Sequence, residues 1–219
     1  PFVEHNIAKL ELGVRINFGQ KYYRYPDGKY IADENNWPLV FLGYEKGFAS
    51  TVDEYDYNEL KFTLSGDFSL QNKGELEYSL KTGTFFNAEN MAFLDYKHFN
   101  GNQTRVGTTP NYIGKFNLLP YYDLSTDQEY AEIHLEHDFQ GWVLGKIPFV
   151  SKLNLNLIAG AKSIFSGGRK PYSEVSLGID NIGIGKFRFL RLDYVRSFYG
   201  DQQEGALIFG IKFFGLLER

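Results

Sequence analysis

The stretch Ala8–Phe18 reads AKLELGVRINF, and its one-for-one alternation decides the fold class. The apolar side chains fall on every second position, at Ala8, Leu10, Leu12, Val14, Ile16 and Phe18. The positions between them hold Lys9, Glu11, Gly13, Arg15 and Asn17. Because a strand turns its side chains over at each residue, this segment predicts a strand with one apolar face and one charged face.

The same rhythm returns along the whole chain and predicts nine strands. Their expected ranges are 6–18, 37–48, 57–70, 74–86, 128–140, 152–165, 172–182, 187–198 and 204–214. Short turn signals such as Gln71-Asn72-Lys73-Gly74 separate them. Strands of this kind with no helix between them predict an all-β fold, an antiparallel transmembrane β-barrel with an apolar outside and a wet interior.

The composition excludes several other classes. The 219 residues carry a net charge of −4, which offers no basic field to nucleic acid. Mean hydropathy is −0.34, and no apolar run approaches the roughly 20 residues of a membrane-spanning helix. Cysteine is absent, which excludes disulfides and thiolate metal sites, while aromatics reach 17%. Aromatic girdles of a membrane barrel account for that share, and an aromatic-rich soluble sandwich is the alternative.

Charged residues concentrate on the faces predicted to point into the barrel. They are Glu132, His134, Glu136 and Asp138 on one strand, and Arg191 and Asp193 on another. Such groups cost little in a water-filled lumen but much in a packed core. Residues two apart on a strand are about 7 Å apart, too far to share one ion unaided, so we expect neither metal nor cofactor.

Two connections are long. The first, 19–36, contains the turn signal Pro26-Asp27-Gly28, and the second, 86–127, far exceeds a hairpin loop. Loops of the second size are usually functional or disordered.

Two runs in and after the long loop carry a family resemblance. They read FLDYKHFNGNQT at 93–104 and YAEIHLEH at 130–137, with LLPYY at 118–122 between them. The chain resembles a Bacteroidota outer-membrane barrel family of unassigned function. Its members usually have an N-terminal carboxypeptidase-regulatory-like domain, which these 219 residues lack. The resemblance implies residence in the bacterial outer membrane, with membrane lipid as a partner.

The chain also resembles the C-terminal half of the surface-antigen superfamily, which includes the insertases that assemble outer-membrane proteins. The turn at Pro26 and Gly28, the hairpin from Asp180 to Tyr194 and the last strand carry this likeness. The superfamily barrel has sixteen strands. Residues 1–219 would then be the C-terminal part of one barrel, and the N-terminal half would be a partner of this chain. Without it, two strand edges would stay open in lipid.

The superfamily resemblance also assigns roles to two groups of residues. The long loop would fold into the lumen, where an arginine motif is expected; instead this chain has Asp95, Tyr96, Lys97, His98, Phe99, Asn100, Gly101, Asn102, Gln103, Thr104 and Arg105. Lys97 and Arg105 are the candidate stand-ins for that arginine. The terminal strand signal and lipid face would be Leu207, Phe209, Ile211, Phe213 and Phe214.

We therefore expect a non-enzymatic envelope protein, acting in transport, export or outer-membrane assembly, with other envelope proteins as partners. Two alternatives remain. A soluble β-barrel that binds a small ligand would place the polar face outside and the apolar face in a core. A surface hydrolase would depend on His98 and Asp95 in the long loop.

Overall fold

Nine long antiparallel strands build the molecule, and they confirm the nine strands predicted from the sequence. The computed structural model describes residues 4–31, 37–52, 55–107, 113–185 and 187–211. The long strands are β1 (Ala8–Asn17), β4 (Leu39–Phe48), β5 (Tyr57–Ser69), β6 (Glu75–Phe86), β8 (Tyr130–Asp138), β9 (Asn156–Ser166), β10 (Tyr172–Ile184), β11 (Phe187–Tyr199) and β12 (Gln202–Ile211). Within the described ranges, no helix is long and apolar enough to cross a bilayer.

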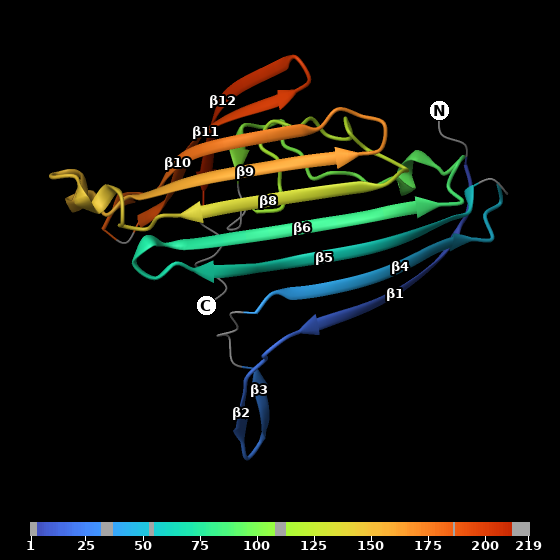
Figure 1. Ribbon diagram of the computed structural model, residues 1–219, viewed down its shortest axis with the longest axis horizontal. Helices are drawn as coiled ribbons and strands as arrows, with labels where there is room; N and C mark the ends of the chain where they lie inside the picture. The colour runs from blue at the N-terminus through green and yellow to red at the C-terminus, as the bar shows by residue number, and fades with distance from the viewer. Residues whose placement is uncertain (1–3, 32–36, 53–54, 108–112, 186, 212–219) are drawn as a thin grey trace.

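The nine strands form one sheet in which each pairs with its neighbours in sequence. The order is β1-β4-β5-β6-β8-β9-β10-β11-β12, and every pairing among them is antiparallel. Figure 1 shows this sheet as a curved wall. β1 and β12 do not pair with each other in the described residues, so the all-β antiparallel prediction holds while barrel closure is not observed.

Three short strands were not predicted. β2 (Tyr22–Tyr25) and β3 (Gly28–Ile31) make a separate hairpin whose turn is Pro26-Asp27, where the sequence signals a turn. β7 (Val106–Gly107) lies in the long loop and pairs parallel with the edge of β12. A two-residue strand has no periodicity of its own, and β7 exists only because the backbone of β12 lies beside it.

The two faces of the sheet have opposite characters. The apolar face is exposed, as shown by Leu10, Leu12, Val14, Leu42, Leu60, Leu135, Phe165, Val175, Leu177, Tyr194, Leu207 and Phe209. Leu12 and Leu177 are 59% and 56% exposed. The charged face is the better buried of the two, with Glu59, Glu132, His134, Lys162, Glu174, Arg191 and Asp193 all nearly inaccessible. This distribution reverses that of a soluble domain.

The segment between β6 and β8 lies against the charged face and buries it. Figure 1 shows this segment in green, behind β8 and β9. Its side chains Met91, Phe99, Phe116, Leu119 and Leu124 form an aromatic-rich core with residues of the sheet. The sheet contributes Tyr57, Phe85, Tyr130, Ile164 and Tyr172 to that core.

Glycines let the sheet curve by making room for aromatic rings. Phe41 lies over both Gly13 and Gly43, and Tyr130 lies over Gly83, so a Cβ at any of the three would meet a ring. An aromatic ring that covers a glycine restores the contact area that the missing side chain cannot supply.

The tight connection between β5 and β6 depends on Gly74. Its φ of +104° and ψ of −156° lie in a region that only glycine occupies readily, and a Cβ there would overlap the backbone carbonyl of Asp138. We expect Gly74→Ala to lower the free energy of unfolding by about 1–3 kcal/mol. Equilibrium urea unfolding followed by tryptophan fluorescence measures the loss. Gly141→Ala is the matched control, because no atom lies within 4 Å of its Cβ position. Equal stability of the two variants would contradict this account.

Candidate functional site: the loop bonded to the charged face

The predicted motif Asp95–Arg105 is a compact, internally bonded part of the long loop. Lys97 and Thr126 exchange both backbone hydrogen bonds, at 2.9 and 3.0 Å, and so close the loop at its base. Asn102 is buried and accepts at Oδ1 from the amide and the hydroxyl of Thr104, at 3.0 and 2.8 Å. Asn102-Gln103-Thr104 is therefore a side-chain-stabilised turn. Gly101 touches the backbone of Leu119 so closely that a Cβ would overlap it.

Three charged residues of this motif bind strands. Lys97 Nζ lies 3.4 Å from Glu132 Oε2 on β8. Arg105 pairs with Glu204 on β12, and Asp95 pairs with Lys9 on β1. Both predicted stand-ins, Lys97 and Arg105, thus meet carboxylates of the sheet. The motif holds the loop at three places spread across the width of the wall.

Glu174 on β10 is the central anchor of the loop. Its carboxylate accepts the backbone N–H of Asn117 and of Leu118, each at 2.8 Å, and the hydroxyl of Tyr172 at 2.7 Å. Lys162 lies directly opposite Glu174 in the β9–β10 register, and its ammonium donates to the carbonyl of Lys115. Two buried, oppositely charged residues of the sheet thereby satisfy three backbone groups of the loop.

Phe116 sits between these backbone contacts and is fully buried. Its ring centroid lies 4.7 Å from that of His134 and 5.8 Å from that of Tyr172. The loop therefore inserts an aromatic side chain into the charged face at the place where its backbone is bound.

The structure corrects the expectation that Glu132 and His134 face open water. Both are about 1% exposed or less, and His134 Nε2 lies 2.6 Å from Glu132 Oε1. Lys81 also reaches Glu132, at 3.5 Å. Two lysines and one imidazole surround this carboxylate, which is how a buried charge avoids the full cost of desolvation.

Arg191 and Asp193 are likewise buried rather than wet. Arg191 Nε donates to Asp193 Oδ2 at 2.7 Å, and its two terminal nitrogens donate to the two oxygens of Glu136 at 2.7 and 2.8 Å. This two-pronged geometry is the strongest that a guanidinium and a carboxylate form. It ties β8 to β11 across the curved sheet.

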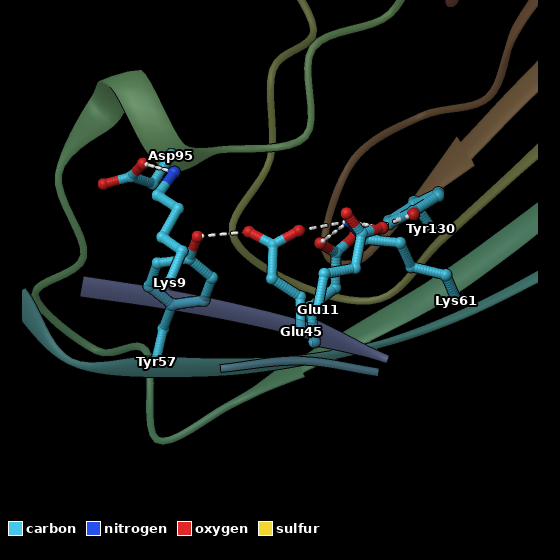
Figure 2. A network of polar contacts seen from close by, with 8 residues as sticks. Lys9, Glu11, Glu45, Tyr57, Lys61, Asp95 and Tyr130 are labelled. Carbon is cyan, nitrogen blue, oxygen red and sulfur yellow. Dashed lines mark hydrogen bonds and ion pairs between the residues drawn. The ribbon is translucent and has the colours of Figure 1, made fainter. Parts of the chain in front are cut away.

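A further cluster, which sequence reasoning missed, centres on Lys61 of β5. Its ammonium lies 2.5 Å from Glu45, 3.2 Å from Glu59 and 3.8 Å from Glu11. Figure 2 shows Lys61 with Glu11 and Glu45, and beside them Tyr57, whose hydroxyl donates to Glu45. It also shows Tyr130, whose hydroxyl donates to Glu59, and the Lys9–Asp95 pair that joins β1 to the loop. The alternating polar positions of each strand were readable, but their convergence depends on the register between strands.

A polar cavity of about 610 Å³ occupies the charged face beside the loop. Its walls include Asp67, Glu75, Glu77, Glu136 and Asp138. In the strand register Asp67 faces Glu77, Glu75 faces Asp138 and Glu77 faces Glu136. Like charges directly opposite one another are tolerated where water and salt screen them. The solvent-accessible carboxylates of this face therefore lie here, around Asp138, and not at Glu132.

The loop pair His98 and Asp95 does not form a hydrolytic arrangement. Burial lowers the pKa of His98, so its ring is neutral near pH 7. Its Nδ1 lies 2.7 Å from Ser125 Oγ, but Ser125 is only 4% exposed and donates to the carbonyl of Tyr122. Asp95 is occupied by Lys9. These contacts position the loop.

The last strand carries the predicted apolar side chains on the exposed face. Leu207, Phe209 and Ile211 are 52%, 56% and 37% exposed, while Phe213 and Phe214 lie outside the described residues. The loop strand β7 pairs with β12 at Phe209 and Gly210, and the amide of Phe209 donates to the carbonyl of Arg105 at 3.0 Å. The long loop therefore covers part of the sheet edge as well as the charged face.

No group of three or more His, Cys, Asp or Glu side chains in the described ranges could hold a metal ion. The arrangement is one of ion pairs and backbone hydrogen bonds, which hold a loop against a wall.

Comparison with known proteins identifies the family. Residues 1–179 match the family described as "Family of unknown function (DUF5686) C-terminal domain". The chain belongs to this family. No curated protein and no solved structure matches the chain.

The sequence singled out the motif Asp95–Arg105 in the long loop, but not the contact between the loop and Glu174. Glu174 and Lys162 were visible as charges on predicted strands, and Phe116 was one of many loop aromatics. Their pairing follows only from the β9–β10 register and from the path of the loop over it.

The loop contact predicts a specific effect of Glu174→Gln. An amide has one acceptor oxygen where the carboxylate has two, and the change removes the negative charge directly opposite Lys162 in the register. We expect loop docking to weaken by about 3 kcal/mol. A single cysteine at the buried Leu119 reports this as a thiol-labelling rate that rises by roughly 100-fold. The natural absence of cysteine makes this measurement clean.

Glu75→Gln is the control for that experiment, because its exposed side chain lines the cavity of the same face. Its labelling rate should match that of the unsubstituted background. An unchanged rate in Glu174→Gln would show that another contact holds the loop.

Proposed function

We propose that this domain is the C-terminal part of the wall of an outer-membrane β-barrel, with the long loop plugging its interior. The observation that carries the proposal is the reversed distribution of side chains. Leu12, Leu177 and Phe209 are more than half exposed on one face, while Glu132, Glu174 and Asp193 are buried on the other. Water does not stabilise such a face, because exposed apolar surface costs about 25 cal/mol per Å². The hydrocarbon of a bilayer removes that cost.

The charged face supports the same proposal. The loop seals one part of it, and the remainder forms the acidic cavity around Glu77 and Asp138. The interior of a membrane barrel combines such polar surfaces with plugs formed by its own loops. A soluble ligand-binding barrel would hold its polar strand positions outside, whereas here Leu12 and Leu177 are exposed and Glu132 and Glu174 are buried.

The open edges constrain the assembly. β1 lacks a partner on its outer side within the described ranges, and β12 has only the two residues of β7. Backbone groups of an unpaired strand cannot remain in hydrocarbon. We infer that further strands close the barrel, as the resemblance to a sixteen-strand superfamily implies. The N-terminal half of the same barrel would supply them.

The proposed role is that of a non-enzymatic envelope component in transport, export or outer-membrane assembly, with other envelope proteins as partners. Buried Glu174, Lys162 and Glu132 hold the loop, while buried Arg191 and Asp193 join strands of the wall. A plug fixed by ion pairs suits a barrel whose interior is closed at rest. The surface-hydrolase alternative lacks a specific supporting contact, since Ser125 is buried and Asp95 is paired with Lys9.

Fractionation of the native membrane tests the proposal. The protein should resist extraction with carbonate, and it should be released by detergent together with the strands that close the barrel. Mass spectrometry then identifies peptides of residues 1–219 and gives the mass of the intact polypeptide that contains them. Recovery of the protein in the soluble fraction without detergent would overturn the proposal.

A charged substitution on the exposed apolar face provides a second test. Leu60 is 49% exposed on β5, so in water Leu60→Arg would cost little. In a bilayer we expect Leu60→Arg to lower the free energy of unfolding by about 2–4 kcal/mol. Urea unfolding in lipid vesicles measures the difference. Ser65→Arg on the same strand is the control, because Ser65 lines the acidic cavity and should accept a cation at little cost.

A further inference from the structure

An apolar patch stands at the end of the sheet opposite the long loop. The segment 139–155 joins β8 to β9 there and includes two short turns of 3₁₀ helix, Leu144–Lys146 and Val150–Leu153. Figure 1 shows it in gold, projecting past the strand ends. We define the terminal patch by its exposed large side chains: Ile147 (45%), Phe149 (82%), Leu153 (54%), Ile184 (87%) and Phe187 (72%).

The terminal patch is a built structure joined by hydrogen bonds. Arg188 Nη1 donates to the carbonyls of Leu153 at 2.5 Å and Asn181 at 3.2 Å. The side-chain amide Nδ2 of Asn181 donates to the backbone carbonyl of Asn154 at 2.6 Å. These bonds fasten the segment 139–155 to the tip of the β10–β11 hairpin. Ile184 and Phe187 face each other across that tip.

Phe149 is held in a costly backbone conformation. Its φ is +70°, a region that bulky L-residues rarely occupy, at a cost of order 1–3 kcal/mol. Its ring is nevertheless 82% exposed, so packing within the chain returns little of that cost. An outward-held aromatic ring of this kind is suited to contact something beyond the chain.

The charge of the segment indicates what it contacts. Residues 139–155 contain Lys146 and Lys152 and no acidic residue, in a chain whose net charge is −4. Lys146 Nζ lies 4.5 Å from the ring of Trp142, and Lys152 Nζ lies 5.9 Å from the ring of Phe149. Exposed aromatic and aliphatic groups flanked by lysines match the interface of an anionic bilayer, where apolar tips enter the acyl boundary and ammonium groups meet phosphates.

We propose that the terminal patch inserts into the headgroup region of an anionic phospholipid bilayer and anchors this end of the wall. The inference rests on the proposed function, because the lipid face of the sheet leads directly to the patch. Leu177 and Ile179 lie on the exposed face of the same hairpin that carries Ile184 and Phe187 at its tip. The patch thus extends the lipid contact beyond the strands and adds to it a preference for negative charge.

Single cysteines on the otherwise cysteine-free full chain test the inference, each carrying an environment-sensitive fluorophore. The probe positions are Phe149 in the patch, Leu177 on the lipid face and Asn72, an exposed turn residue at the same end of the sheet. Reconstitution uses vesicles of phosphatidylcholine with or without phosphatidylglycerol, and brominated acyl chains serve as the quencher. The label at Phe149 should shift to the blue and be quenched, more so with phosphatidylglycerol. The label at Asn72 should remain unquenched.

Charge removal tests the anionic preference. Lys146→Gln combined with Lys152→Gln should lower the insertion equilibrium of the Phe149 label in phosphatidylglycerol vesicles by about 30-fold. Insertion in pure phosphatidylcholine should hardly change. An equal response of the double variant and the parent to phosphatidylglycerol would overturn the anionic preference.

The probe positions separate failure of this inference from failure of the proposed function. Quenching at Leu177 without quenching at Phe149 overturns the anchor while the membrane wall stands. A label at Phe149 that neither aqueous iodide nor brominated acyl chains quench would overturn the anchor and indicate a contact with protein. Absence of quenching at Leu177 overturns the proposed function itself.

Discussion

The carboxylate of Glu174 joins the two parts of this structure, the wall and the loop that lies on it. It is buried on β10, faces Lys162 on β9 and receives two backbone N–H groups of the loop. A buried carboxylate is stable only where cations and donors surround it. The sheet supplies the cation, and the loop supplies the donors. The loop is therefore held in one position, because its N–H groups stabilise a carboxylate that is buried on the charged face.

The same condition extends across the charged face. Glu132 forms ion pairs with Lys81 of the sheet and with Lys97 of the loop. Arg191 forms ion pairs with Glu136 and Asp193. Around Glu75 and Asp138, where the loop contributes only Ile113 and Gly114 to the cavity wall, carboxylates face one another and the cavity remains. The opposite face needs no such compensation and is mainly apolar.

The sequence alone was enough to predict the nine long strands, because alternation such as that of Ala8–Phe18 is a local property. The character of each face follows from the same alternation. The turns at Pro26-Asp27 and at Gln71–Gly74 carry local signals as well. Other features are not local. The contacts of Glu174 with Asn117 and Leu118, the convergence of Glu11, Glu45 and Glu59 on Lys61, and the strand β7 all depend on register or on a distant backbone, and no short sequence pattern reports either.

The burial of Glu132 and His134 shows where reasoning from alternation reaches its limit. Alternation assigns both to the charged face, and that assignment is consistent with the structure. It does not say whether water or protein covers that face. The answer lies in the loop, whose Phe116 ring packs at a tilt against that of His134 and whose Lys97 reaches Glu132. A long connection after a strand whose inner face is both charged and aromatic is therefore better read as a segment with its own ion-pair partners than as an excursion into solvent. Its lysines and arginines are the first residues to match against the carboxylates of the wall.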